Sequence, residues 1–309
     1  RVEYFRDPTV ALEAFKAGQI DYRQENIAKD WATAYDFPAE RDKKVIKEEF
    51  PIRNVGVMQA FAFNIRRDKF SDPRVRRALT LALDRYTASK ALSKIAIVKE
   101  VAGVQVPGTP YATPPDELAK LAGYWHDIDK SRAEAKRLLK EAGVPEGFSF
   151  TFKNRGIPMP YEPLGVWLID QWRQIGLNVT QKVDEPAAHF GVLRKGDFET
   201  AMDFQCGYIV EPDLDMYRFT SVSRNPANYG GYEDPVLDKL YDEQSQATNP
   251  EERKKLVREF EKRLLDEQAH VLMTLQWHRI IPHSSRLHGW TITPSHYLNN
   301  TLDTVWLSP

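Results

Sequence analysis

Phe63-Asn-Ile-Arg-Arg-Asp-Lys-Phe-Ser-Asp-Pro-Arg-Val-Arg-Arg-Ala-Leu-Thr-Leu-Ala-Leu-Asp-Arg85 is the stretch that best predicts the fold of this chain. Its second half predicts a helix with a clear start. Asp72 is suited to cap the free amides of the first turn, and Pro73 fits the first helical position, where no amide hydrogen is needed. The apolar residues that follow recur at helical spacing and form one face: Val75, Ala78, Leu79 and Ala82.

The residues before this helix predict a strand and a short loop. Met58 to Ile65 is apolar and aromatic, as in a buried strand. A loop is expected at Asp68 to Ser71, after which the capped helix covers the core. Physical reasoning alone supports a strand–helix unit here and nothing more specific.

The same stretch resembles the signature of the peptide/nickel family of extracellular solute-binding proteins, the ligand receptors of ABC importers. Nine residues carry the resemblance: Asn64, Phe70, Asp72, Val75, Arg76, Ala78, Ala82, Asp84 and Arg85. Further stretches are similar to the same family, and the segment from Asn26 to Asp36 is most similar to its oligopeptide branch of the Yej type. The resemblance implies a two-lobed α/β fold of the periplasmic binding protein type II, with the lobes joined by a hinge.

Composition excludes several classes of protein. The 309 residues carry 43 Lys and Arg against 44 Asp and Glu, whereas nucleic-acid binders usually show a basic excess. No stretch approaches the ~18 apolar residues of a membrane span. The single cysteine, Cys206, excludes an internal disulfide and any multi-cysteine metal site. We therefore expect a protein without transmembrane segments that binds no nucleic acid.

The remaining pattern predicts alternating strands and helices. From Phe148 to Cys206 a β-α-β-α-β run indicates helices packed on a largely parallel sheet. Near the start, strands at Val2–Phe5 and Ile20–Arg23 flank a helix and are expected to form a parallel pair. The segment Glu211–Tyr232 is expected to be irregular, and two helices should follow it, at Pro235–Ala247 and Pro250–Gln268.

For every candidate catalytic or metal-binding set of residues, an ordinary structural role explains the residues better than a functional one. The chain has no G-x-S-x-G, phosphate-binding glycine loop or H-E-x-x-H. His278, His283 and His288 are evenly spaced, but neither a strand nor a helix would bring all three together. Asp213 and Asp215 are expected in turns or caps. We therefore expect no catalytic residue, no metal and no cofactor.

Two loops after predicted strands contain the candidate ligand-binding residues, because ligands of α/β lobes meet the carboxyl ends of strands. In the first loop, Arg155 could hold a carboxylate in bidentate fashion, and Tyr161, at the end of the same loop, is a second candidate. The family resemblance implies the same, since its dipeptide branch has an arginine just after this strand. The alternative is a surface arginine paired with Glu162.

The second loop contains Tyr208, Ile209 and Glu211. In the peptide-binding branches of the family this loop carries an aspartate that pairs with the ligand's α-amino group. Here Tyr208 occupies that place, which puts recognition of a free amine in doubt. Tyr208 could stack on the ligand or form a hydrogen bond with it. Glu211 could supply a negative charge or cap the next turn.

The resemblance implies a receptor that binds peptides or peptide-like solutes and delivers them to an ABC permease in the membrane. It also implies a periplasmic location, or an extracellular and lipid-anchored one. Three alternatives remain open: a family member for a non-peptide solute, an α/β hydrolase or transferase, and a scaffold that binds other proteins.

The resemblance also predicts the domain organisation. Residues 1–55 and 280–309 are expected in the first lobe and residues 56–279 in the second, with hinge crossings near Pro51–Val57 and Trp277–His283. The chain matches only the carboxy-terminal portion of a receptor, so it is expected to lack the amino-terminal part of the first lobe. With only one wall of the binding site present, the chain should bind ligand weakly or not at all by itself, and bared apolar surface, which costs roughly 25 cal/mol per Å², should favour self-association.

Overall fold

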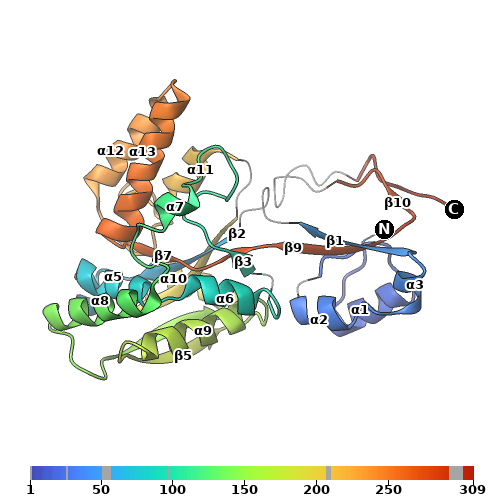
Figure 1. Cartoon of the computed structure of the whole chain (residues 1–309), viewed down its shortest axis with the longest axis horizontal. Coiled ribbons are helices and arrows are strands. Elements are labelled where there is room, and N and C mark those ends of the chain that lie inside the picture. Colours follow the sequence, from blue (N-terminus) through green and yellow to red (C-terminus); the bar gives the residue numbers. More distant parts are fainter. Residues whose placement is uncertain (1, 26, 51–56, 97, 207–209, 292–301) are drawn as a thin grey trace.

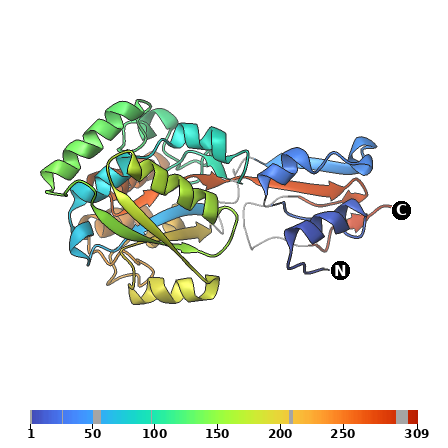
Figure 2. The ribbon, with the colours of Figure 1, turned by 90° about the horizontal axis from the view of Figure 1, so that it is seen from below.

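The computed structural model describes residues 2–25, 27–50, 57–96, 98–206, 210–291 and 302–309. The molecule is elongated (Figure 1). Most of the chain forms a large α/β body at one end. The first 50 residues lie at the other end, together with the strands that close the chain, and the two parts are joined by long strands (Figures 1 and 2).

A five-stranded sheet in the order β5-β4-β6-β2-β7 forms the centre of the large body. β4 pairs in parallel with β5 and β6, as the sequence pattern predicts, whereas β2 is antiparallel to both β6 and β7. The parallel arrangement predicted from residues 148–206 is therefore confirmed, and β2, which lies outside that run, makes the sheet mixed because it enters between two strands that run the other way. The five strands are β2 (Val57–Phe63), β4 (Ser149–Arg155), β5 (Asn178–Asp184), β6 (Thr200–Cys206) and β7 (Val271–Met273).

Helices cover this sheet and form its main core. Trp172 of α9 (Tyr161–Arg173) is fully buried against Phe150 and Phe152 of β4, and its Nε1 donates to the carbonyl of Leu79 at 3.0 Å. That bond ties α9 to α5 (Pro73–Leu81), which packs on α8 (Ile128–Glu141). The predicted apolar face of α5 is the buried one.

The start of α5 is as the sequence predicts. The side chain of Asp72 accepts from the backbone amide of Arg74 at 2.8 Å, and Pro73 is the first helical residue. The loop predicted at Asp68–Ser71 is instead a short helix, α4. Phe70 is fully buried in the core, and its carbonyl accepts from Arg76 Nη1 at 2.6 Å, which holds this turn closed.

Two arginines of the signature stretch are buried and bind backbone carbonyls. Arg76 donates to the carbonyls of Gln268 and Ala269, and burial lowers its pKa to about 10. Arg85 is 1% exposed and donates from Nε and Nη2 to the carbonyl of Met273, at 2.9 and 2.7 Å, and from Nη1 to that of Gly123. These bonds fasten the segment before β7 and β7 itself to α5 and α6.

The smaller part is built on β1 (Val45–Phe50), which pairs antiparallel with β9 (Arg279–Ser284). Figure 2 shows the two strands side by side. Bridges from Tyr22 to His283 and from Glu25 to Ile280 extend this pairing. The parallel pair predicted from residues 2–5 and 20–23 is wrong. The second segment instead bridges β9 in antiparallel fashion, and Val2 and Tyr4 are exposed and outside any strand.

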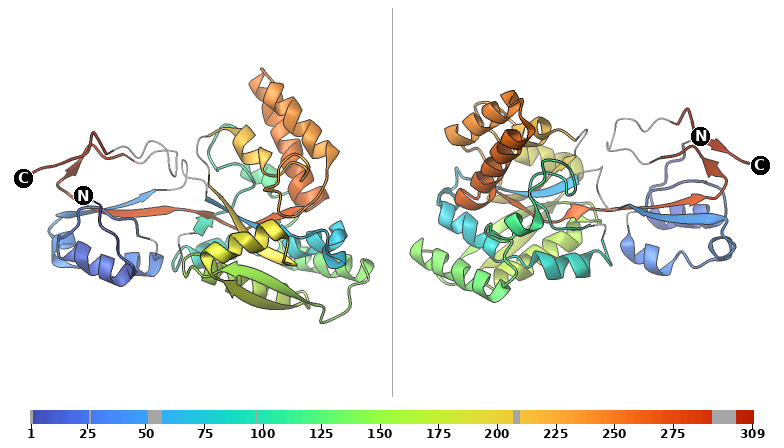
Figure 3. Two further views of the ribbon diagram at one scale, coloured as in Figure 1. Left: turned by 180° about the vertical axis from the view of Figure 1, so that it is seen from behind. Right: turned by 45° about the horizontal axis from the view of Figure 1, so that its top comes forward.

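The other elements follow the sequence pattern with two differences. Residues 211–232, expected to be irregular, contain α11, and the helix after Pro250 ends in a π-helical turn, η1. Helices α12 and α13 form a hairpin that projects from the large body (Figure 3). The remaining bounds are α1 Pro8–Lys16, α2 Ala28–Thr33, α3 Pro38–Arg41, α6 Arg85–Leu92, β3 Val98–Glu100, α7 Pro115–Leu118, α10 Pro186–Lys195, α11 Pro212–Tyr217, α12 Pro235–Gln246, α13 Pro250–Lys262, η1 Arg263–Glu267, β8 Gln276–Trp277, β10 Leu287–His288 and β11 Trp306–Leu307.

We predict that Arg85→Met lowers the free energy of unfolding by roughly 2–6 kcal/mol, since each buried carbonyl left without a donor costs about 1–3 kcal/mol. Urea denaturation followed by circular dichroism measures the change. Arg74→Met is the matched control, because Arg74 is exposed and contacts the Asp72 carboxylate. Equal stability of the two variants would contradict a structural role for Arg85.

Candidate ligand-binding site

Arg155 is the last residue of β4 and lies in a shell of aromatic rings. Its guanidinium carbon is 4.4 Å from the centroid of Phe204, 4.8 Å from Tyr161 and 5.1 Å from Phe190. Nη1 donates to the hydroxyl of Tyr161 at 2.7 Å, and Nε is buried without a hydrogen-bond partner in the part of the chain that the structure describes. A cation stacked in this way retains donors at its edge for an anion.

The pairing considered for Arg155 with Glu162 does not form, since the guanidinium bonds Tyr161 instead. Tyr161 opens α9 and is 2% exposed. The structure thus brings two of the candidate residues, Arg155 and Tyr161, into direct contact.

Trp277 extends this cluster toward the smaller part of the molecule. Its ring lies 6.4 Å from that of Tyr161, and it packs against the small cluster of Ala28 and Ile280, as Trp31 does. Sequence reasoning placed Trp277 at a crossing but did not name it as a site residue. Its bulk at the predicted crossing was the available signal, because aromatic residues dominate contacts between packed parts.

Two of the candidate residues of the second loop, Tyr208 and Ile209, lie outside the described residues. Glu211 is described, and its carboxylate has two structural roles. It caps α11 by accepting from the amide of Asp213 and forms an ion pair with Arg253 of α13. Of the two roles considered for Glu211, the structure shows capping.

Arg253 is a residue that sequence reasoning missed. Besides Glu211 it lies 3.5 Å from the Asp213 carboxylate, donates to the side chain of Gln244 at 3.1 Å and stacks on Tyr111. Most of its partners are distant in sequence, and the pattern of α13 is typical of a helix with a charged face in solvent. No local pattern therefore indicates that Arg253 links α13 to the loop before α11. Asp213, expected in a turn or cap, instead joins this network.

The three evenly spaced histidines do not converge. His278 Nε2 is 3.5 Å from Glu49, His283 Nε2 is 3.3 Å from Glu48, and His288 stacks on Trp306. Within the residues that the structure describes, no group of three or more His, Cys, Asp or Glu side chains could hold a metal ion.

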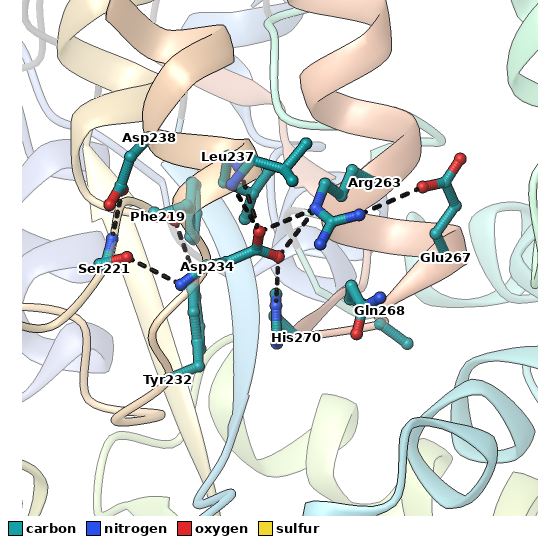
Figure 4. Close-up of polar contacts among 12 residues, drawn as sticks. Phe219, Ser221, Tyr232, Asp234, Leu237, Asp238, Arg263, Glu267, Gln268 and His270 are labelled. Carbon is teal, nitrogen blue, oxygen red and sulfur yellow. Dashed lines mark hydrogen bonds and ion pairs between the residues drawn. The ribbon is translucent and has the colours of Figure 1, made fainter.

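A buried polar cluster around Asp234 fastens α12 to η1 and to the segment after it (Figure 4). Asp234 caps α12 and forms an ion pair with Arg263 at 2.8 Å. His270 Nε2 lies 3.0 Å from the same carboxylate, and its ring stacks on Tyr232 at 3.9 Å. Ser221 Oγ accepts from the amide of Asp234, so the hydroxyl serves the backbone of this turn.

The environment of this cluster lowers the pKa values of both Asp234 and His270. Burial raises the pKa of Asp234, but hydrogen bonds from His270 and Arg263 outweigh it and hold the pKa at about 2. Burial lowers the pKa of His270 despite the neighbouring Asp234. A neutral imidazole that donates to an ionised carboxylate therefore holds the cluster together.

The comparisons with known proteins agree with this geometry. A family profile, the middle part of the bacterial extracellular solute-binding proteins of family 5, matches residues 1–227. The chain belongs to this family. Its members are periplasmic or extracellular receptors, and the mixed α/β architecture described above is the periplasmic binding protein type II fold. Among the described residues, no helix is long and apolar enough to cross a membrane.

One curated relative is the probable peptide-binding protein YejA of Agrobacterium fabrum, 46% identical over 92 residues, which are 29% of this chain and 15% of the relative. Among solved structures, DppA of Helicobacter pylori in complex with the peptide STSA has a TM-score of 0.78 at 19% identity and covers 99% of this chain and 56% of its own. AgaA of A. tumefaciens R10, in complex with agropinic acid, has a TM-score of 0.78 at 19% identity, covering 99% and 60%. The chain spans only part of each relative.

We predict that Asp234→Asn flattens the acid dependence of stability. A carboxylate with a lowered pKa stabilises the fold fully above its ordinary value of 3.8, and the contribution is lost as the pH falls toward about 2. Urea denaturation across this range measures the slope, with Asp129→Asn on the exposed first turn of α8 as control. An unchanged slope in the Asp234 variant would contradict the assignment.

Proposed function

We propose that this protein is part of the receptor of an ABC-type importer that binds peptides or peptide-like solutes and delivers them to a membrane permease. The observation that carries the proposal is Arg155, a partly buried cation in an aromatic shell with its Nε unpaired among the described residues. A peptide's carboxylate is the bidentate partner that a guanidinium prefers. Membership of the solute-binding family supports the same conclusion.

The proposed ligand cleft lies between two lobes. Residues 1–55 and 280–309 form one lobe and residues 56–279 the other, with crossings near Pro51–Val57 and Trp277–His283. The pairing of β1 with β9 and the packing of Trp277 against the cluster of Ala28 and Ile280 support this division. Closure of such lobes on a hinge would bring Arg155 and Tyr161 against the bound solute.

The proposed partners follow from the family. The receptor would work in the periplasm, or outside the cell with a lipid anchor, and deliver its solute to an ABC permease. Self-association through exposed apolar side chains remains a prediction. The interpretation as an α/β hydrolase or transferase has only the β-α-β run and Arg155 in its favour, and family membership favours a binding protein.

A non-peptide solute is the second candidate for the ligand. AgaA, a structural relative, is bound to agropinic acid, which is not a peptide. The site accommodates this alternative because Arg155 would recognise any solute that carries a carboxylate.

We predict that Arg155→Gln weakens binding of short peptides with a free carboxyl end about tenfold or more, since charge-assisted bonds of this kind are worth ~1.5–3 kcal/mol. Matched peptides with an amidated end should bind wild type and variant alike. Calorimetry on the intact receptor measures both affinities.

Arg173→Gln, in the exposed last turn of α9, is the matched control and should bind like wild type. If Arg155→Gln retained full affinity for the free carboxyl form, the assignment of Arg155 would be wrong. If no peptide bound the wild-type receptor, the peptide proposal itself would fail, and carboxylate-bearing opines would be tested next.

A further inference from the structure

Glu49 of β1 connects the smaller part of the molecule to the β3–β8 pair of the large body. Its Oε1 lies 3.1 Å from Lys99 Nζ of β3 and 3.5 Å from Nε2 of His278, the residue between β8 and β9. β1 pairs with β9, and β3 pairs with β8, so these contacts join two separate sheets. The link lies where the two proposed lobes meet.

His278 has an unusual environment for a histidine at such a link. The side chain is 3% exposed, and Nδ1 is buried without a hydrogen-bond partner among the described residues. Nε2 faces the Glu49 carboxylate, so the neutral ring is best placed with its proton on Nε2. In that form the imidazole donates to Glu49 and Nδ1 carries no hydrogen.

Protonation of His278 would create a second N–H, at Nδ1, in a buried place where the described residues offer no acceptor. A buried donor without an acceptor destabilises the structure that contains it. The gain in attraction to Glu49 is smaller, because that carboxylate is 45% exposed and already paired with Lys99. Burial accordingly lowers the pKa of His278, with Glu49 raising it and Lys99 lowering it.

His283, which lies on β9 shortly after His278, provides an internal comparison. Its Nε2 lies 3.3 Å from Glu48, the neighbour of Glu49, and its Nδ1 lies 3.0 Å from the carbonyl of Ser284. A protonated His283 would therefore have an acceptor at each nitrogen. Protonation should disturb the structure at His278 and leave it intact at His283.

We propose that His278 is a pH-sensitive link between the two lobes, which holds β1 against the β3–β8 pair when neutral and loosens this junction when protonated. The inference rests on the two-lobed receptor proposed above. The groups that face His278 are Glu49 from β1 and Lys99 from β3. Acidification of the medium would thus favour separation of the lobes and release of solute.

Hydrogen exchange of the intact protein tests this link without any ligand. Protection factors of the β1 and β3 amides would be compared at about pH 7.5 and about pH 5, on either side of the usual histidine pKa. We expect wild type to lose protection in these strands at the lower pH, relative to β4 in the large sheet. His278→Gln, which keeps a donor near the Nε2 position but does not titrate, should show equal protection at both values.

His283→Gln is the matched control and should retain the wild-type loss. The proposal is overturned if wild type keeps its protection at a pH where nitrogen NMR shows His278 protonated, or if His278→Gln still loses it. If His278→Gln fails to fold, nitrogen NMR of the wild-type ring decides: protonation of His278 without a change at the β1 amides would overturn the proposal. Because no solute is present, failure of peptide binding leaves this test unaffected.

Discussion

Two buried arginines bind backbone carbonyls of β7 and of the segment that leads into it, and this binding positions the returning chain. Arg76 holds the carbonyls of Gln268 and Ala269, and Arg85 holds that of Met273. β7 begins within this segment, and the chain continues through β8 into β9. The two guanidinium groups therefore determine where the returning chain joins the sheet and where it leaves for the smaller part.

This constraint gives several residues of the signature stretch a structural role. A cation as large as arginine is buried only if its donors are satisfied, and backbone carbonyls satisfy them here. Asn64 has a similar role, since its side-chain amide donates to the carbonyls of Gly196 and Phe198, both at 2.9 Å. These signature residues therefore stabilise the scaffold, whereas the proposed solute recognition falls on the loop that follows Arg155.

The sequence predicted local structure well because helix starts depend on a few adjacent residues. Asp72, Pro73 and the apolar face of α5 were all identified. Arg155 and Tyr161 were named as candidates from the same loop, but their hydrogen bond was not predicted. The direction of β2 was not predicted, because it depends on how distant segments of the chain, β6 and β7, come to lie beside it. Likewise, the ion pair of Glu211 with Arg253 joins residues 42 positions apart, beyond any local pattern.

The same reasoning explains the error at the start of the chain. Val2–Phe5 has the alternation of a strand, but alternation shows only that a segment could pair. The neighbouring positions of β9 are taken by β1 and by the bridges at Tyr22 and Glu25. The burial of His278 and its unpaired Nδ1 were also beyond sequence reasoning, since they arise where β1, β3 and β9 meet.

The proposed role of this chain, as part of an importer receptor for peptides, can be tested on the molecule that the intact receptor carries. Native mass spectrometry of the intact receptor as purified, followed by release and sequencing of any bound molecule, identifies that solute. We expect a mixture of short peptides with free carboxyl ends. A single bound sugar, bile acid or opine, with no peptide released, would contradict it.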